Sequence, residues 1–412
     1  MGDWFLINLG ISLICTISIL EVIISSNSVY VKNFQWLSGI PLLQHLVLSF
    51  ANLSKASNWL QEINKLPSLL ELQLSNCDLS GFIPPIPSIN FSSLTALDLS
   101  LNSFENTSIL FWVFGLHNLV SLDLSGNQFQ GIIPVHIQNL TSLRHLDLSG
   151  NGFNSSIRSW LYSFSHLEFL NLSSNYLQGT ISSAIGNLTS AISIDLSYDE
   201  LEGKVPRSLA NLYNLRAIRL SSNKWSQEIS EIFESLSGCV SNRLEILEMD
   251  DAQLSGQLTA ELGQFKNLVI LSLGSNSISG PIPWSIGNLS SLRSLYLVNN
   301  QINGTLPQSC GLLSKLESLY IDSNMLEGAT SEVHFSNLTR LTLLYASKNR
   351  LPWKVSLDWI PPFQINSLVL GSWNLGPKFP SWLCSQEQFL SLAISNIGII
   401  DAIPPWFWNL SS

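Results

Sequence analysis

Ser121, His145 and Asp147 are the residue types of a hydrolytic triad, in which histidine takes the serine proton and aspartate orients the imidazole. Each of the three occupies a position that recurs along the chain, and no nucleophile elbow or oxyanion motif accompanies them. The sequence also contains no phosphate-binding loop, kinase signature or C-x-x-C metal spacing. We therefore expect no enzymatic activity, no cofactor and no metal site.

The segments that position these side chains follow a repeat of 24 residues. Its clearest copy, Leu292 to Pro307, has the form L-x-x-L-x-L-x-x-N-x-I-x-G-x-L-P. The slot that Asn300 occupies recurs at intervals of 24 to 29 residues, and most of the intervals are 24. The slots fall at positions 27, 51, 77, 102, 127, 151, 175, 199, 223, 252, 276, 300, 324, 349, 373 and 397. A fixed period of this length indicates a leucine-rich-repeat array.

Within each repeat the x-x-L-x-L-x-x segment alternates, which predicts a short strand with its leucines facing inward. The slot asparagine is expected to hydrogen-bond backbone groups that the following turn would otherwise leave buried and unpaired. One repeat cannot bury its leucines alone, whereas stacked neighbours can. The predicted fold is an α/β-type repeat: a leucine-rich-repeat solenoid, or curved superhelix, with an inner parallel β-sheet and irregular or 3-10 outer segments.

The repeat frame also predicts boundaries. Residues 29–412 hold about fifteen plant-type repeats and end without a C-terminal cap. Residues 1–28 form an apolar N-terminal segment with two open interpretations, a degenerate repeat ending at Asn27 or a signal peptide or anchor. Glu21 would be costly inside a bilayer. The 29-residue interval from Asn223 to Ala252 predicts a loop on the outer or lateral side.

The composition of the chain indicates which partners it can bind and in which compartment it is located. Charged residues make up only 12% of the chain and the net charge is −10, which argues against nucleic acid and anionic membrane surfaces. The five cysteines are too few for a disulfide scaffold, and Cys77 fills an asparagine slot as a buried structural thiol. Eleven N-x-S/T sequons predict a glycosylated extracellular array. They begin at Asn52, Asn90, Asn106, Asn139, Asn154, Asn171, Asn187, Asn288, Asn303, Asn337 and Asn409.

The residue between the two strand leucines should point to the concave face. In the first half of the chain it is usually the aspartate of a Leu-Asp-Leu-Ser phrase, which we interpret as structural and solvated. From Arg219 onward this consensus letter disappears, and charged and tyrosine side chains take its place. These side chains have two alternative interpretations: they make contacts between neighbouring strands, or they recognise a ligand. The predicted ligand-binding set is Arg216, Arg219, Glu248, Asp250, Arg293, Tyr296, Tyr320 and Tyr345.

The L-x-G-x-I-P form of the repeat, as in residues 79–84 and 278–283, resembles plant-specific extracellular leucine-rich repeats. Longer phrases such as Trp359-Ile-Pro-Pro-Phe-Gln364 and Pro380-Ser-Trp-Leu383 are similar to receptor-like proteins of the ethylene-inducing-xylanase receptor group. The resemblance extends from about Tyr30 to Ser412.

This resemblance implies an extracellular array at the plasma membrane that senses a microbial protein or peptide in innate immunity and has no kinase of its own. Its partners would be a protein, peptide or glycan ligand and a co-receptor kinase in the full-length receptor, and not nucleic acid. The family's paired-cysteine cap, island, membrane helix and tail have no counterpart in this sequence. Two alternatives therefore stay open, a secreted inhibitor of a pathogen cell-wall hydrolase and a truncated, non-functional receptor fragment.

Overall fold

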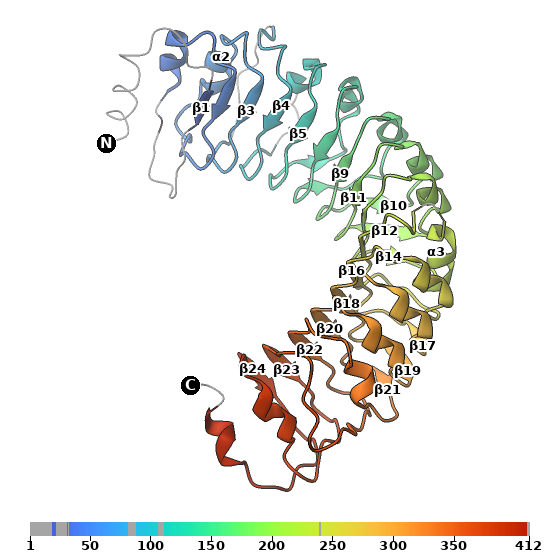
Figure 1. Ribbon diagram of the computed structural model, residues 1–412. Coiled ribbons are helices and arrows are strands. Elements are labelled where there is room, and N and C mark those ends of the chain that lie inside the picture. The colour runs from blue at the N-terminus through green and yellow to red at the C-terminus, as the bar shows by residue number, and fades with distance from the viewer. Residues whose placement is uncertain are drawn as a thin grey trace. The chain divides into compact units, whose positions relative to one another are not determined.

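The computed structural model describes residues 19–21, 31, 33–80, 88–105, 111–238 and 240–409. The chain divides into two compact units, one made of Met1–Gly179 with Asn187–Asp199 and the other of Thr180–Gly186 with Glu200–Ser412. Both units repeat the same turn, a three-residue strand followed by a short helical segment (Figure 1). No helix in the described part of the chain is both long and apolar enough to cross a membrane.

In the first unit, eight strands pair in parallel and in chain order. They are β1 (Ile19–Glu21), β2 (His45–Val47), β3 (Glu71–Gln73), β4 (Ala96–Asp98), β5 (Ser121–Asp123), β7 (His145–Asp147), β9 (Phe169–Asn171) and β11 (Ser193–Asp195). Shorter strands are β6 (Gln130–Gly131), β8 (Gly152–Phe153) and β10 (Gln178–Gly179). The helical segments are η1 (Gln35–Gly39), α2 (Trp59–Ile63), η3 (Val113–Gly115), η4 (Val135–Asn139), η5 (Ser159–Ser163) and, partly, η6 (Ser183–Asn187). The rest of the N-terminal segment 1–28 lies outside the described residues.

In the second unit, eight further strands pair in the same way: β13 (Ala217–Arg219), β15 (Ile246–Glu248), β16 (Ile270–Ser272), β18 (Ser294–Tyr296), β20 (Ser318–Tyr320), β22 (Leu343–Tyr345), β23 (Ser367–Val369) and β24 (Ser391–Ala393). Its shorter strands are β12 (Glu200–Gly203), β14 (Lys224–Trp225), β17 (Ser279–Gly280), β19 (Gln301–Gly304) and β21 (Met325–Leu326). Its helices are η7 (Arg207–Asn211), α3 (Ile229–Leu236), η8 (Ala260–Gln264), η9 (Trp284–Asn288), η10 (Gln308–Leu312), η11 (Glu332–Phe335), η12 (Ser381–Ser385) and η13 (Pro405–Asn409). Figure 1 shows the main strands of this unit on one face and the helices on the opposite face.

The leucines of the repeat form the core, as the pattern predicts. In the copy used above, Leu292, Leu295, Leu297 and Ile302 are all buried, while the strand residues on either side of Leu295 are only half-buried. Burying one such side chain stabilises the fold by about 1.5–3 kcal/mol. Because the same positions recur in every repeat, the buried side chains of neighbouring repeats form continuous columns, and the leucine-rich-repeat solenoid is confirmed.

The slot asparagine connects one repeat to the next. The side-chain amide of Asn300 donates to the carbonyl oxygens of Leu297 at 3.2 Å and of Leu273 in the preceding repeat at 2.9 Å. Its Oδ1 accepts the backbone N–H of Ile278, also in the preceding repeat, at 3.0 Å. The side chain therefore satisfies buried backbone groups on both sides of the repeat boundary, which is the role that the sequence predicted.

Two unusual slot residues reproduce the donating half of this bridge. The Cys77 thiol donates to the Leu48 carbonyl at 3.2 Å, and the Trp373 indole Nε1 donates to the Ala346 carbonyl at 2.7 Å. Both carbonyls lie three residues before the preceding slot, where Asn300 also finds its partner. Burial raises the pKa of the Cys77 thiol to about 12, so the sulfur keeps the proton that it donates.

The 29-residue interval departs from the expectation. The sequence predicted a loop there. The structure shows an α-helix, α3, in place of the 3-10 turn of most other repeats, and a turn follows it at residues 237–238 and 240–243. The extra residues complete two helical turns, and Ile229, Ile232, Phe233 and Leu236 are buried at a spacing that places them on one helical face. Phe233 packs against Phe265 of the next repeat, with ring centroids 5.9 Å apart. The predicted loop is therefore confirmed only after Leu236, and the helix before it follows from an apolar spacing of helical period that the interval length does not reveal.

Candidate ligand-binding face of the second unit

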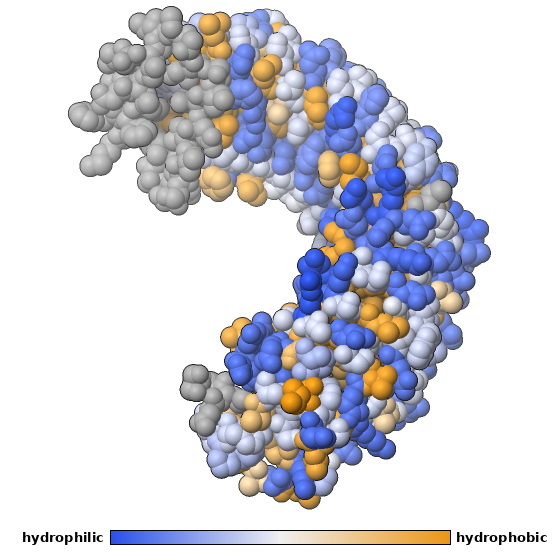
Figure 2. Space-filling view, in the orientation of Figure 1, coloured by the Kyte–Doolittle hydropathy of each residue, from blue (hydrophilic) through white to orange (hydrophobic). Residues whose placement is uncertain are grey.

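Strand register places the central face residues of the second unit in one row. Arg219 lies opposite Glu248, Tyr296 opposite Tyr320, and Tyr320 opposite Tyr345, each pair on neighbouring parallel strands. The full row is Arg219, Glu248, Ser272, Tyr296, Tyr320, Tyr345, Val369 and Ala393. Figure 2 shows hydrophilic and apolar residues interspersed over the visible surface of this unit. The structure thus gathers most of the predicted ligand-binding residues on one strand face.

Tyr296, Tyr320 and Tyr345 form a stack, here called the tyrosine ladder. The ring centroids of Tyr296 and Tyr320 are 4.8 Å apart at an interplanar angle of 30°, and those of Tyr320 and Tyr345 are 4.4 Å apart at 10°. Parallel strands lie about 4.8 Å apart, so identical rings at matched positions meet face to face. The stacking alternative is therefore observed, and the three rings remain half-buried.

A hydrogen bond to the next strand holds the ladder at one end. The Tyr345 hydroxyl hydrogen-bonds the Ser367 hydroxyl at 2.8 Å. Burial raises the pKa of Tyr320 above its usual value of 10, and the neighbouring Tyr345, Tyr296 and Asp322 add to this effect. The Tyr320 phenol therefore stays protonated at physiological pH and can both donate and accept a hydrogen bond.

Ion pairs between neighbouring strands flank the ladder. Nε of Arg219 lies 2.8 Å from Oε2 of Glu248, and Nη1 of Arg216 lies 2.7 Å from Oε1 of Glu245. Arg293 pairs with Glu317 at 3.0 Å. Such half-exposed pairs contribute about 0–1 kcal/mol of stability each, but a guanidinium has five N–H donors and one pairing leaves several of them available.

Asp250 has a different environment from the other predicted residues. Its Oδ1 accepts the Ser272 hydroxyl and the Gly274 backbone N–H, both at 2.7 Å. A side chain at Gly274 would meet this carboxylate at 3.0 Å, so the glycine allows the close approach. The Asp250 carboxylate is therefore occupied by hydrogen bonds at the end of β16. Its effect on a ligand would be indirect, through the position of that strand.

Ser121, His145 and Asp147 of the first unit lie at the strand positions that the repeat predicts. Ser121 and His145 occupy opposite positions on β5 and β7. The Asp147 carboxylate accepts the Ser149 backbone N–H at 2.9 Å and hydroxyl at 2.6 Å, and its other oxygen accepts the Asn171 amide at 2.9 Å. These bonds attach Asp147 to its own turn and to the next strand, which is a structural role.

The predicted glycosylation sites differ in exposure. Asn52 and Asn171 are half-buried, and their amides donate to Asp78 and Asp147 respectively. Asn106 and the side chain of Asn409 lie outside the described residues. The exposed sequon asparagines are Asn90, Asn139, Asn154, Asn187, Asn288, Asn303 and Asn337.

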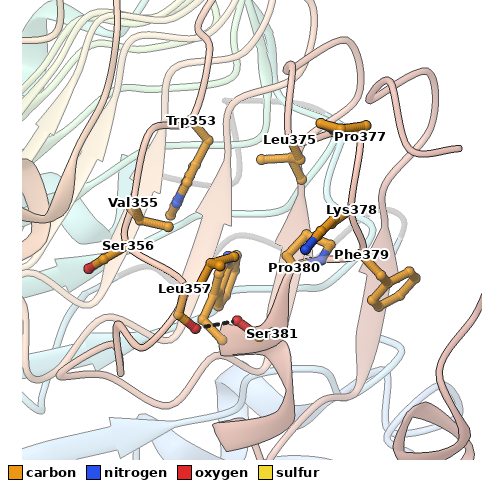
Figure 3. A pocket seen from close by; sticks show the side chains of 12 residues that line it. Trp353, Val355, Ser356, Leu357, Leu375, Pro377, Lys378, Phe379, Pro380 and Ser381 are labelled. Carbon is orange, nitrogen blue, oxygen red and sulfur yellow. Dashed lines mark hydrogen bonds between the residues drawn. The ribbon is translucent and has the colours of Figure 1, made fainter. Parts of the chain in front are cut away.

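Sequence analysis missed a cavity of about 340 Å³ in the second unit. Its walls are Trp353, residues 355–357 and residues 375–382, which follow two successive slots (Figure 3). The available signal was the density of tryptophan, because Trp353, Trp359, Trp373 and Trp382 all fall within one short stretch. Large rings in a segment that elsewhere carries small residues keep neighbouring turns apart.

Several known proteins are similar to this chain in sequence or in fold. A leucine rich repeat family matches residues 92–153, and a second leucine rich repeat family matches residues 68–88, 166–188, 267–289 and 291–313. Receptor-like protein EIX1 of Solanum lycopersicum is 41% identical over 388 residues, 93% of this chain and 37% of that protein. The chain resembles plant leucine-rich-repeat receptor-like proteins. Receptor-like protein EIX2 of the same plant is 46% identical over 83 residues, 20% of this chain and 8% of that protein.

The repeat array spans little more than a third of the length of EIX1. Among solved structures, a TDR receptor superposes with a TM-score of 0.70 at 29% identity, covering 87% of this chain and 60% of that one. These similarities establish the leucine-rich-repeat fold and a resemblance in sequence to plant receptor-like proteins. The class of ligand is inferred below from the residues on the strand face.

Proposed function

We propose that this chain is the ligand-recognition array of a plant cell-surface receptor-like protein, and that the face carrying the tyrosine ladder binds a microbial protein or peptide. The observation that carries the proposal is the ladder, three stacked tyrosines at matched positions of consecutive strands. Tyrosine combines a large contact area with few rotatable bonds and a polar tip, which makes it a frequent anchor of protein interfaces.

The stack lowers the cost of binding, because each ring is already held by its neighbours. Ordering a free side chain at an interface costs about 0.5–1.5 kcal/mol, and a preformed ladder avoids most of this loss. The stacking also favours a protein or peptide over a glycan. Sugars pack their C–H groups on the faces of aromatic rings, and here neighbouring rings cover the faces of Tyr320.

The charged residues beside the ladder would orient the ligand. Arg219 and Arg293 each keep donors beyond their pairing with Glu248 and Glu317, so a ligand carboxylate or carbonyl can bind without breaking either pair. Asp250 would act by holding β16 in place. The proposed contact set is therefore the ladder with Arg216, Arg219, Arg293 and Glu248 around it.

The resemblance to EIX1 and EIX2 supports a location on the extracellular side of the plasma membrane and a role in innate immunity. In this proposal the protein has no kinase of its own and signals through a co-receptor kinase. Surface biotinylation of the tagged protein in plant cells tests the location, because a cell-surface receptor is labelled and retained, whereas a secreted hydrolase inhibitor accumulates in the medium.

The binding face is tested with a random dodecapeptide library displayed on phage and selected against the immobilised chain. Selected peptides should lose at least about tenfold in affinity when Tyr296, Tyr320 and Tyr345 are all replaced by alanine. The matched control replaces three exposed tyrosines outside the ladder, Tyr176, Tyr198 and Tyr213, which should leave affinity unchanged. Circular dichroism confirms that both triple variants fold. Peptides that bind the ladder variant as well as the wild type would sink the proposal.

A further inference from the structure

The cavity lined by Trp353, residues 355–357 and residues 375–382 has the dimensions of a ligand site. Its volume is about 340 Å³, at the lower end of the range of small-molecule pockets, about 300–1,000 Å³. Figure 3 shows Trp353, Val355 and Leu357 on one side, with Leu375, Lys378 and Phe379 on the other. The Ser381 hydroxyl donates to the Leu357 carbonyl at 2.6 Å and ties the two walls together. The cavity is therefore bounded by two turns with a fixed connection.

Most of the lining side chains are apolar, and two buried hydrogen-bond donors among them have no partner in the described part of the chain. Trp353 and Trp382 stack with ring centroids 5.3 Å apart and are only 8% and 4% exposed. The indole Nε1 of each is buried, and neither reaches an acceptor among the described residues. A buried donor without a partner destabilises the fold, so a ligand that brings an acceptor to it gains binding free energy.

Lys378 is the one charged side chain among the residues that line the cavity. Lys378 is an exposed lining residue, it forms no ion pair with the described residues, and no acidic side chain lines the cavity. Two acidic side chains from outside the lining reach the cavity walls by accepting backbone hydrogen bonds from lining residues. Glu332 accepts the Ser356 backbone N–H at 2.7 Å, and Asp401 accepts the Phe379 backbone N–H at 3.4 Å.

We propose that this cavity binds a small apolar carboxylic acid. Its ring or hydrocarbon body would lie against the side chains of Trp353, Leu375 and Phe379, and its carboxylate would pair with Lys378 and accept from an indole N–H. Apolar walls with a few convergent polar groups are the usual composition of such sites. The residues involved follow the slots rather than forming the strands, so this site is separate from the tyrosine ladder and can be tested without it.

The test is isothermal titration calorimetry of the full chain with 4-phenylbutyrate and with its uncharged amide, 4-phenylbutyramide. The carboxylate should bind saturably and about fivefold more tightly than the amide. Lys378→Met should abolish this difference, and the control Lys354→Met, at an exposed lysine outside the lining, should preserve it. Trp382→Phe, which removes an indole donor but keeps an aromatic ring, should weaken carboxylate binding by about threefold to tenfold.

Two filling variants locate the site. Val355→Trp and Leu357→Trp place a large ring in the cavity, and the second position is 73% exposed, so the fold should tolerate it. Each filled variant with an unchanged thermal midpoint should lose binding of both probes. Absence of saturable carboxylate binding in the wild type overturns the proposal and leaves the cavity as a contact surface for a protein side chain. Binding that persists in both filled variants also overturns it, because the probe then binds elsewhere.

Discussion

Tyr320 and Tyr345 stack almost in parallel, with ring centroids 4.4 Å apart and an interplanar angle of 10°. The residues lie directly opposite each other on β20 and β22, so the spacing of the rings follows the spacing of the strands. On its far side Tyr345 hydrogen-bonds Ser367 of β23. The central ring of the ladder is therefore positioned by three consecutive repeats. Its loss should reduce ligand affinity more than the loss of a terminal hydroxyl.

Replacing Tyr320 by leucine should reduce the affinity of ladder-binding peptides by at least about tenfold, since it removes the central ring and both stacks. Tyr345→Phe keeps the stack and loses a hydroxyl that bonds Ser367 and interacts with the Tyr320 phenol, so affinity should fall by less than about threefold and stability by about 1 kcal/mol. Surface plasmon resonance and thermal denaturation of the two variants measure these effects. Equal losses of affinity would contradict the role assigned to the central ring.

The repeat frame predicted the strands, the buried leucines and the bridging role of Asn300, because these follow from a period that recurs in every copy. It also predicted which side chains share a face, since side chains alternate along a strand. The helix α3, the indole bridge of Trp373 and the cavity were not predictable in this way. Each arises where a repeat departs from the consensus, and the path of the backbone there depends on packing against the neighbouring turns.

Exchanging the charges of Arg219 and Glu248 tests whether the pair contributes to stability, to ligand recognition or to both. Arg219→Glu places two carboxylates on opposite positions and should lower stability by about 0.5–1 kcal/mol. Adding Glu248→Arg restores the pair with exchanged positions, so stability should recover. Binding of the selected peptides should not recover, because the charges that they contact have changed places.

The matched control for this exchange is the pair Arg144–Glu168, whose Nη1 and Oε1 atoms are 2.6 Å apart in the first unit. Exchanging its charges should change stability no more than exchanging those of Arg219 and Glu248, and should leave peptide affinity unchanged. Recovery of peptide affinity in the Arg219→Glu, Glu248→Arg double variant would show that these charges serve the fold alone.

Asp123→Asn should stabilise the protein at neutral pH. Burial raises the pKa of the Asp123 carboxyl above its usual value of 3.8, and Asp147 and Asp98 add to this effect. A raised folded-state pKa means that the native state binds more protons than the unfolded state, so stability declines as pH rises through the range above 3.8. Asparagine keeps the same bonds, because Asn171 already accepts the N–H and hydroxyl of Ser173 as Asp123 does those of Ser125.

The expected gain from Asp123→Asn is about 0.5 kcal/mol at pH 7, a small value because the carboxyl is partly solvated. At pH 3 the wild-type carboxyl is mostly protonated in both states and the gain should vanish. Thermal midpoints at the two pH values provide the measurement. Asp123→Ala is the control, and it should destabilise at both pH values because it removes the acceptor. A gain that is equal at pH 3 and pH 7 would show that charge is not its cause.

Trp373→Phe should destabilise the second unit. Phenylalanine retains an aromatic ring in a site that is 1% exposed, but it cannot donate to the Ala346 carbonyl. The lost hydrogen bond costs about 1 kcal/mol and the unfilled volume adds to this. Trp284→Phe is the matched control, because the Trp284 side chain is exposed and its replacement should leave the midpoint of guanidinium denaturation unchanged. Similar midpoints for the two variants would mean that the indole bridge contributes no stability.

Folded, secreted protein should carry no glycan on Asn171. Its amide donates to Asp147 at 2.9 Å, and its Oδ1 accepts both the N–H and the hydroxyl of Ser173, so a glycan would disrupt a half-buried set of bonds. Asn187 is exposed and should be occupied. Glycopeptide mass spectrometry of the protein from plant cells compares the two sequons directly. Asn187→Gln should increase electrophoretic mobility and Asn171→Gln should not, whereas a glycan detected on Asn171 would show that this strand face opens in the native protein.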